Sequence, residues 1–412
     1  MSHFITDIQI NKIFHLENIH IPIDKKEKKH LIITGKNGSG KTSLLISLKE
    51  LLSRIINDST LQFLRYGEFL DSSKIRLEQL INQNAPHTAI HQQEQNFKYH
   101  NEQFQNTFGK VNINFTHIIE ISKLVHANNF VMAIYEANRK TLMNKPPNPE
   151  KPNLKTLYQI QDNTQQEFLK FLVDLKVQEA LARNENDEKY ADEIRVWFDN
   201  FTNLLKDIFG NSNVQLEFNF KDYSFSIIEN NKCFGFNELS DGYSAIIDIV
   251  ADLILKMQSP DNITRAFQKE GIVLIDEIET HLHLELQKTI LPFLTKVFPN
   301  IQFIVTTHSP FVLSSIDNAV AYDLEKQESL DDLSTYSYEA LAEGYFNVSS
   351  ESSHLDCKLK RFEELLDLVE RDMAETKELK NLDEELGQLD KNLTPENILE
   401  QYLLLKVKYP IK

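Results

Sequence analysis

The chain has 412 residues, 41% of them hydrophobic, and a formal net charge of -17. Its length and apolar content predict a globular protein of two or three domains with sizeable cores. The acidic balance argues against wholesale wrapping of nucleic acid and leaves room only for a local DNA contact through a basic patch.

The sequence lacks the patterns of a cysteine-based zinc site and of a membrane-spanning or secreted protein. The cysteines, Cys233 and Cys357, lie far apart and form no CxxC pair, which rules out a cysteine-based zinc site and fits a reducing compartment. We expect both to be packing residues. The N-terminus has no basic stretch before an apolar core, and no apolar run approaches the ~18 residues that span a bilayer. The sequence therefore predicts a soluble, cytoplasmic protein with no membrane partner.

Residues 4 to 34 are rich in strand-forming side chains. Isoleucines alternate with polar residues, and the apolar run 31–33 follows a lysine-rich turn. This turn could face DNA, but a solvated turn is favoured because the charge run is short: Lys25, Lys26, Lys28 and Lys29.

The next stretch has the form G-x-x-x-x-G-K-[ST], which we call the P-loop. It lies between an apolar run and a helical pattern, the context that a phosphate-binding loop requires. The motif predicts binding of ATP or GTP, with Lys41 reaching the β- and γ-phosphates and the Thr42 hydroxyl holding Mg²⁺. The residues expected around the phosphates are Gly35, Lys36, Asn37, Gly38, Ser39, Gly40, Lys41, Thr42 and Ser43.

Residues 52 to about 205 resemble a polar insertion with helices and short strands. The Gln- and His-rich part from 82 to 105 and the Pro-rich part from 144 to 152 are expected to be loops or weakly ordered connections. Alternating or apolar runs predict strands at 111–115 and 130–135. Helical spacing and then alternation predict two core-facing helices and a hairpin at 168–182, 190–209 and 214–227.

Two apolar strands in the second half end in polar side chains. The first strand, 271–275, is followed by Asp276 and Glu277. Residues that follow a buried parallel strand lie at its carboxyl end, where ligands bind in open α/β sheets. We expect Asp276 in the Mg²⁺ shell and Glu277 to polarise the attacking water as general base. The second strand, 301–307, ends at His308.

The order of these motifs resembles that of ABC-type ATPases, in the branch that includes RecF, Rad50, SMC and OLD-family proteins. Leu239-Ser-Asp-Gly-Tyr243 is similar to their LSxGx signature, which begins a helix near Ser240. The resemblance implies that Ser240, Asp241 and Gly242 of one protomer close over the nucleotide of a second. It also implies that His308 is the switch histidine, which contacts the γ-phosphate.

The resemblance implies an α/β fold with a mixed sheet and flanking helices. The ATPase core would be split between 1–55 and 210–330, with an inserted, mainly helical lobe at 56–209 and a C-terminal helical tail at 331–412. Amphipathic helices in the tail fit partner docking and structural bracing equally well. The Q-loop glutamine of such ATPases has four candidates by position: Gln159, Gln161, Gln165 and Gln166.

Departures from the pattern narrow the resemblance. Transporters usually continue with Ser-Ala-Leu-Asp after the glutamate, whereas this chain is similar to the E-x-H-L-H pattern of OLD-like ATPases, with Glu279, His281 and His283. Here a loop that senses the partner's nucleotide is favoured over a zinc or iron site. The gap between P-loop and signature excludes the long heptad arms of Rad50 and SMC proteins. The tail shows no acidic cluster of a Toprim nuclease.

A short ATPase of this kind is similar to the ATPase subunits of bacterial anti-phage systems such as Septu, retron-associated systems and PARIS. The stretch 338–348 is a weaker sign of the same group. The resemblance implies a self-associating ATPase that controls a separate effector, such as an HNH or Toprim nuclease. Two alternatives stay open: a RecF-like repair or recombination ATPase that binds DNA without a toxic effector, and the nucleotide-binding domain of a transporter.

Overall fold

The computed structural model describes six stretches of the chain: residues 2–139, 142–258, 267–330, 353–368, 371–389 and 396–409. The chain divides into two compact units, Met1–Ser334 and Thr335–Lys412. Each unit has its own cluster of buried apolar side chains.

The first unit contains these strands: β1 (Ile5–Ile13), β2 (Leu16–Pro22), β3 (His30–Thr34), β4 (Val111–Phe115), β5 (Phe130–Tyr135), β6 (Gln215–Asn219), β7 (Ser224–Glu229), β8 (Lys232–Gly235), β9 (Glu270–Ile275), β10 (Ile301–Thr306), β11 (Ala319–Asp323) and β12 (Glu328–Leu330). Its α-helices are α1 (Lys41–Asn57), α2 (Tyr66–Asn82), α3 (His87–Phe108), α4 (Ile118–His126), α5 (Phe168–Asn184), α6 (Glu188–Phe209), α7 (Asp241–Met257), α8 (Leu284–Val297) and α9 (Pro310–Leu313). Short 3-10 helices lie at Gln62–Arg65, Gln165–Glu167 and Phe236–Glu238.

A six-stranded sheet in the order β12-β11-β3-β10-β9-β5 forms the centre of this unit. Its neighbouring strands are parallel except for β11 and β12, which are antiparallel. The carboxyl ends of β3, β9 and β10 therefore meet at one edge of the sheet, where ligands bind in open α/β sheets. The predicted α/β class with a mixed sheet is confirmed.

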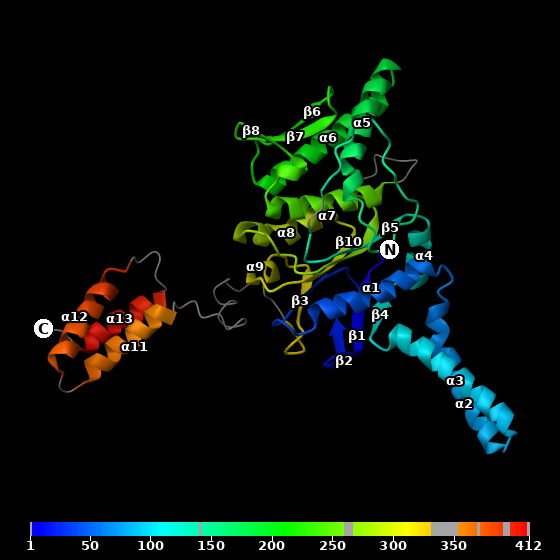
Figure 1. Cartoon of the computed structure of the whole chain (residues 1–412), viewed down its shortest axis with the longest axis horizontal. Coiled ribbons are helices and arrows are strands. Elements are labelled where there is room, and N and C mark those ends of the chain that lie inside the picture. Colours follow the sequence, from blue (N-terminus) through cyan, green and yellow to red (C-terminus); the bar gives the residue numbers. More distant parts are fainter. Residues whose placement is uncertain are drawn as a thin grey trace. The chain divides into compact units, whose positions relative to one another are not determined.

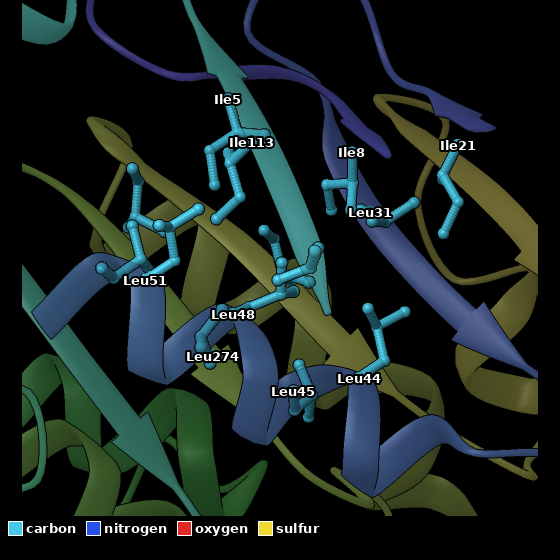
Figure 2. Close-up of a cluster of buried hydrophobic side chains, with 14 of the residues drawn as sticks. Ile5, Ile8, Ile21, Leu31, Leu44, Leu45, Leu48, Leu51, Ile113 and Leu274 are labelled. Carbon is cyan, nitrogen blue, oxygen red and sulfur yellow. The ribbon is translucent and has the colours of Figure 1, made fainter. Parts of the chain in front are cut away.

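Helix α1 packs between this sheet and an antiparallel sheet of order β2-β1-β4. Its buried side chains recur every three or four residues, so they form one apolar stripe. Figure 2 shows Leu44, Leu45, Leu48 and Leu51 of this stripe among isoleucines of the antiparallel sheet. Burying each such side chain stabilises the fold by about 1.5–3 kcal/mol. The stripe thus fixes the start of α1, which directly follows the P-loop. Helices α7 and α8 lie on the other side of the six-stranded sheet (Figure 1).

The segment expected as an inserted lobe contributes two strands to these sheets. Strand β4 pairs with β1, and β5 pairs with β9 at the edge of the six-stranded sheet. Sequence periodicity predicts such strands, but it does not show their partners, because pairing depends on contacts far apart in the chain. The division of the chain at 56 and 209 stays a prediction.

The prediction of loops in the Gln- and His-rich part is wrong. Residues 87–108 form helix α3, which packs along α2. Its buried and partly buried positions include 90, 93, 97, 100, 104 and 107, but of these only Ile90, Phe97 and Phe104 are apolar, so the apolar part of the stripe is narrow. A stripe that narrow suffices for a two-helix contact but gives a weak apolar signal in the sequence.

The helices predicted at 168–182 and 190–209 are confirmed as α5 and α6. They pack through a cluster of aromatic rings in which Trp197 stacks on Phe201 and meets Phe171 edge to face. A small antiparallel sheet of order β6-β7-β8 adjoins them, and its last strand leads into the signature. Cys233 on β8 and Cys357 are exposed, so the expectation that both are packing residues is wrong.

The second unit consists, in the described part, of α11 (Ser353–Asp367), α12 (Met373–Gly387) and α13 (Glu396–Lys408). Leucines from all three helices meet around Phe362, which is fully buried. Arg361 on α11 donates two hydrogen bonds to the carboxylate of Glu378 on α12. The apolar faces of these three helices therefore pack against one another and form a hydrophobic core within the second unit.

His30 makes the stability of the first unit depend on pH. It is buried, and its Nδ1 accepts a hydrogen bond from the backbone N–H of Phe303 at 3.0 Å. Burial, and secondarily the charge of Lys28, lowers its pKa from 6.5 to about 4. Between these pH values the unfolded chain binds a proton that the folded chain does not. The stability that His30 contributes is therefore complete above pH 6.5 and is lost as the pH falls toward 4.

We predict that His30→Gln, whose amide oxygen can also accept the hydrogen bond, removes this pH dependence. Urea unfolding of wild type and variant should be compared near pH 7.5 and near pH 4.5. The wild type should lose on the order of 3 kcal/mol more than the variant between the two pH values. Equal losses would show that His30 does not cause the dependence.

Candidate nucleotide site

The P-loop has a backbone that requires glycine. Gly35, Gly38 and Gly40 have φ values of 136°, 83° and 99°. A Cβ at Gly35 would lie 2.8 Å from Oγ of Ser39, and one at Gly40 would lie 2.8 Å from Cδ1 of Leu16. The loop therefore curls tightly enough to direct backbone N–H groups toward an anion at the start of α1. Within the described residues, the buried Oγ of Ser39 has no hydrogen-bond partner, which suits a loop that binds phosphate.

Lys41 is the buried cation of this loop. Its Nζ donates to the backbone oxygens of Gly35 at 2.8 Å and Lys36 at 3.0 Å. Burial lowers the pKa of Lys41, and nearby carboxylates, that of Glu277 first, oppose this effect. The ammonium group thus lies where it can contact a phosphate group and is close to the acidic pair, Asp276 and Glu277.

The acidic pair is joined to the P-loop helix by hydrogen bonds. Oγ1 of Thr42 donates to Oδ2 of Asp276 at 2.8 Å, and Oγ1 of Thr306 donates to Oδ1 of the same carboxylate at 2.6 Å. The backbone N–H of Glu277 donates to Oγ1 of Thr306 at 2.8 Å. These contacts bring together the hydroxyl and the carboxylate predicted to hold Mg²⁺. Both offer the hard oxygen atoms that Mg²⁺ prefers, so the residues present fit the ion.

Glu277 lies at a sharp turn beyond β9. Its φ is 43°, a left-handed value that is uncommon for a residue with a side chain. Its Oε2 accepts a hydrogen bond from Oγ1 of Thr280 at 3.2 Å, and its side chain is only partly buried. The turn therefore leaves the carboxylate accessible while its backbone is held by Thr306.

Arg139 supports this turn from behind and was not singled out by the sequence. Its Nη2 donates to the backbone oxygens of Asp276 at 2.7 Å and Glu277 at 2.8 Å. Only 9% of the residue is exposed, and burial lowers its pKa to about 10. Its position just beyond the buried strand β5 was the only available signal, because no motif marks it.

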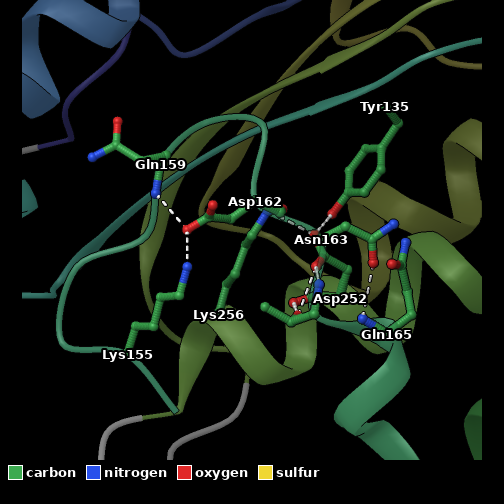
Figure 3. Close-up of polar contacts among 9 residues, drawn as sticks. Tyr135, Lys155, Gln159, Asp162, Asn163, Gln165, Asp252 and Lys256 are labelled. Atoms are coloured by element: carbon green, nitrogen blue, oxygen red, sulfur yellow. Dashed lines mark hydrogen bonds and ion pairs between the residues drawn. The ribbon is translucent and has the colours of Figure 1, made fainter. Parts of the chain in front are cut away.

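A cavity of about 310 Å³ lies beside Arg139 and Tyr135. Of the four candidate Q-loop glutamines, Gln161 and Gln165 line it and Gln159 and Gln166 do not. Gln165 is buried, and its Oε1 has no hydrogen-bond partner within the described residues. In Figure 3 the amide of Gln159 points away from the group around Asp252. Two of the four candidates thus line this cavity, and the role of the Q-loop glutamine stays a prediction.

Asp252 ties the helix that follows the signature to this cavity. Its carboxylate accepts hydrogen bonds from Oη of Tyr135 and from the backbone and hydroxyl of Thr164, each at 2.7 Å (Figure 3). Lys256, one turn further along α7, forms an ion pair with it at 2.8 Å. Both charged groups are almost fully buried, so each compensates the burial cost of the other.

The signature, Leu239 to Tyr243, lies at the start of α7. Ser240 is exposed and immediately precedes α7. Gly242 is buried against the loop beyond Glu277, where a Cβ would lie 2.9 Å from the backbone oxygen of His281. No hydrogen bond of the described residues joins Ser240 or Gly242 to the P-loop. The structure therefore brings the P-loop, Asp276 and Glu277 together and leaves Ser240 and Asp241 of the signature exposed.

His308 follows β10 and is partly buried. Burial lowers its pKa, and the charge of the nearby Lys41 lowers it further. His308 therefore lies near Lys41, and its contact with the γ-phosphate stays a prediction. Its backbone N–H is held by Glu279.

The metal alternative for the E-x-H-L-H loop finds no support in the geometry. His281 and His283 are exposed, while both carboxylate oxygens of Glu279 accept hydrogen bonds from residues 307 and 308. Across the described stretches there is no group of three His, Cys, Asp or Glu residues that could hold a metal ion. The stretch 338–348 lies outside the described residues.

The lysine-rich turn before β3 is partly used within the chain. Lys28 donates to backbone oxygens of Pro299 and Ile301, and Lys29 lies 3.7 Å from Asp24. Lys25 and Lys26 are exposed.

In the part of the chain that the structure describes, no helix is long and apolar enough to cross a membrane.

Comparison with known proteins places much of this site in one family. Residues 138–314 match the AAA_21 family, described as "AAA domain, putative AbiEii toxin, Type IV TA system". The match includes the signature, Asp276, Glu277 and His308, and it begins after the P-loop.

Two curated relatives match parts of the chain. The Septu protein PtuA of Bacillus mycoides (strain KBAB4) is 36% identical over 163 residues, which are 37% of this chain and 23% of that protein. The "Retron Ec83 probable ATPase" of Escherichia coli is 45% identical over 92 residues, which are 22% of this chain and 17% of that protein. The chain thus matches less than a quarter of the length of these relatives.

Among solved structures, the chain is similar to the SMC head in "Crystal structure of the SmcHead bound to the C-winged helix domain of ScpA". The two are 12% identical with a TM-score of 0.38, and the match covers 79% of this chain and 96% of that one. Residues 138–314 thus match the AAA_21 family of ATPase domains, and parts of the chain are similar in sequence to Septu PtuA and to a retron ATPase.

Proposed function

We propose that the protein binds ATP with Mg²⁺ and hydrolyses it at a site shared by two copies of the chain. The observation that carries this proposal is the run of hydrogen bonds from Thr42 through Asp276 and Thr306 to Glu277, beside the buried ammonium group of Lys41. It joins the groups that bind phosphate, bind a hard cation and activate water.

Each group has a role that follows from its place. The P-loop N–H groups and Lys41 bind the phosphates, and Thr42 and Asp276 hold Mg²⁺, which when bound neutralises phosphate charge. Glu277 accepts a proton from the attacking water as general base. His308 contacts the γ-phosphate, and Gln161 or Gln165 serves as the Q-loop glutamine.

The second copy supplies the signature. Ser240, Asp241 and Gly242 lie at the start of α7, whose positive end favours an anion. Because Ser240 is exposed and is not hydrogen-bonded to its own P-loop, it is available to the nucleotide of a partner copy. ATP would then hold a dimer together.

The biological setting we propose is anti-phage defence, in which the ATPase controls a separate effector such as an HNH or Toprim nuclease. Partial homology to Septu PtuA and retron ATPases supports it. Co-expression with the products of adjacent genes should yield a complex whose stability changes with ATP. Salt-sensitive, ATP-stimulated binding of duplex DNA by the chain alone would favour a RecF-like function instead.

Lys41→Ala tests nucleotide binding. Removing a charged hydrogen-bond donor from the phosphates should weaken ATP binding roughly tenfold to hundredfold. Equilibrium binding of a fluorescent ATP analogue with Mg²⁺ measures this. Lys25→Ala removes an exposed lysine far from the phosphates and should bind like wild type. Unchanged binding by Lys41→Ala would contradict the proposed site.

A further inference from the structure

The loop beyond Glu277 connects the signature to the strand that ends at His308. Glu279 lies in this loop, and its side chain spans two successive residues beyond β10. Its Oε1 accepts a hydrogen bond from the backbone N–H of His308 at 2.5 Å, and its Oε2 accepts one from Oγ1 of Thr307 at 2.7 Å. One carboxylate thus accepts hydrogen bonds from two successive residues, from the hydroxyl of Thr307 and from the backbone of His308.

The loop that carries Glu279 is itself held firmly. The backbone N–H of Ile278 donates to the oxygen of Thr306 at 3.1 Å, and that of Leu282 donates to the oxygen of Glu279 at 2.9 Å. The side chains of Ile278 and Leu282 are buried. Glu279 is therefore presented from a fixed backbone, and the bonds it makes restrain His308 rather than the loop.

The same loop touches the signature at its other end. The backbone oxygen of His281 and Cα of Leu282 lie 2.9 and 3.8 Å from the place of a Cβ at Gly242. Only glycine permits this approach. A displacement of the signature helix would therefore press on the loop that holds His308.

A carboxylate suits this contact best. It accepts from both donors at once, whereas a glutamine has one acceptor oxygen and would keep the contact to Thr307 only by donating its amide to a hydroxyl oxygen that already accepts from the backbone N–H of Ser309. Hydrogen bonds to an ionised group are also stronger than neutral ones. The charge is balanced on the same side of the sheet by Arg139 and Lys41, whose charged forms Glu279 favours.

We propose that Glu279 is a positioning residue that fixes His308 for the reaction and links it to the signature. The inference rests on the proposed ATPase function. It assigns the glutamate of the E-x-H-L-H pattern to a hydrogen-bonded connection between two parts of the site, rather than to a metal.

The test begins with Glu279→Gln. Its kcat for ATP hydrolysis should fall about tenfold to hundredfold, because a charged hydrogen bond is lost, while the Kd for ATP stays within about twofold. Glu78→Gln removes one exposed carboxylate from α2, which takes no part in the site, and should behave like wild type. Turnover is expressed per molecule that binds nucleotide, so a variant that is only less stable would show a lower Tm with unchanged kcat. That outcome would overturn the proposal.

A double-mutant cycle with Thr307 tests the contact itself. Thr307→Val should lower kcat and Thr307→Ser should restore it. Because Thr307→Val also removes the acceptor of the Ser309 N–H, the double variant with Glu279→Gln should lose more than Glu279→Gln alone but less than the sum of the two single losses. Additive losses would contradict a shared role. Hydrogen exchange of a peptide that includes His308 should be faster in Glu279→Gln. Unchanged exchange would overturn the link, whereas a wild-type chain that turns over no ATP would instead remove the proposed function.

Discussion

Glu277→Gln should bind ATP with wild-type affinity and hydrolyse it ~10²–10⁴-fold more slowly, because an amide cannot accept the proton of the attacking water. The substitution keeps the size of the side chain and leaves the backbone bond to Thr306 in place. Binding is measured by equilibrium titration and turnover by phosphate release with Mg²⁺ in excess.

Two comparisons make the Glu277→Gln result specific. Glu78→Gln removes a carboxylate of the same size from an exposed position on α2 and should leave both quantities unchanged. Glu277→Gln should also accumulate the ATP-bound assembly, because nucleotide is bound but not consumed. Hydrolysis at the wild-type rate would remove Glu277 from the role of base and leave its turn beyond β9 without a catalytic explanation.

Ser240→Arg should abolish hydrolysis, with a loss of roughly 10²-fold or more, and leave ATP binding to the single chain intact. Ser240 is exposed and makes no hydrogen bond to its own P-loop among the described residues. A long charged side chain there would block the approach of a second copy without touching the first nucleotide site.

The measurement for Ser240→Arg combines nucleotide titration, phosphate release and light scattering with and without ATP. Wild type should grow in mass with ATP, and Ser240→Arg should not. Gln215→Arg adds the same side chain at an exposed position on β6 and should assemble normally. Weak nucleotide binding by Ser240→Arg would mean that the signature acts on its own chain.

Local patterns were enough to predict the centre of the fold. The apolar runs of β3, β9 and β10 and the amphipathic spacing of α1 are short-range signals that need no knowledge of partners. The pairing of β5 with β9 and the packing of α3 on α2 depend on contacts between distant residues, which no local period reveals. Such contacts explain why the inserted region was the least predictable part.

The candidate site divides in the same way. Lys41, Thr42, Asp276 and Glu277 carry motifs with fixed spacing, and the structure places them together. Arg139 acts through backbone oxygens, which any residue provides, so no partner residue in the sequence marks it. Likewise, the E-x-H-L-H pattern identifies Glu279 as a residue of interest. It does not show that the carboxylate of Glu279 accepts a hydrogen bond from the backbone of His308.

The central claim is that the nucleotide site is completed by a second copy of the chain, and it is tested most directly by mixing two inactive variants. Glu277→Gln lacks a working base and Ser240→Ala lacks a working signature, and neither substitution blocks the approach of a second copy. A mixed dimer contains one intact site, formed by the P-loop and Glu277 of the Ser240→Ala chain and the signature of the Glu277→Gln chain. Equal mixing should restore about a quarter of wild-type ATPase activity, since half of the dimers are mixed and each has one of two sites. A mixture as inactive as its components would contradict the shared site.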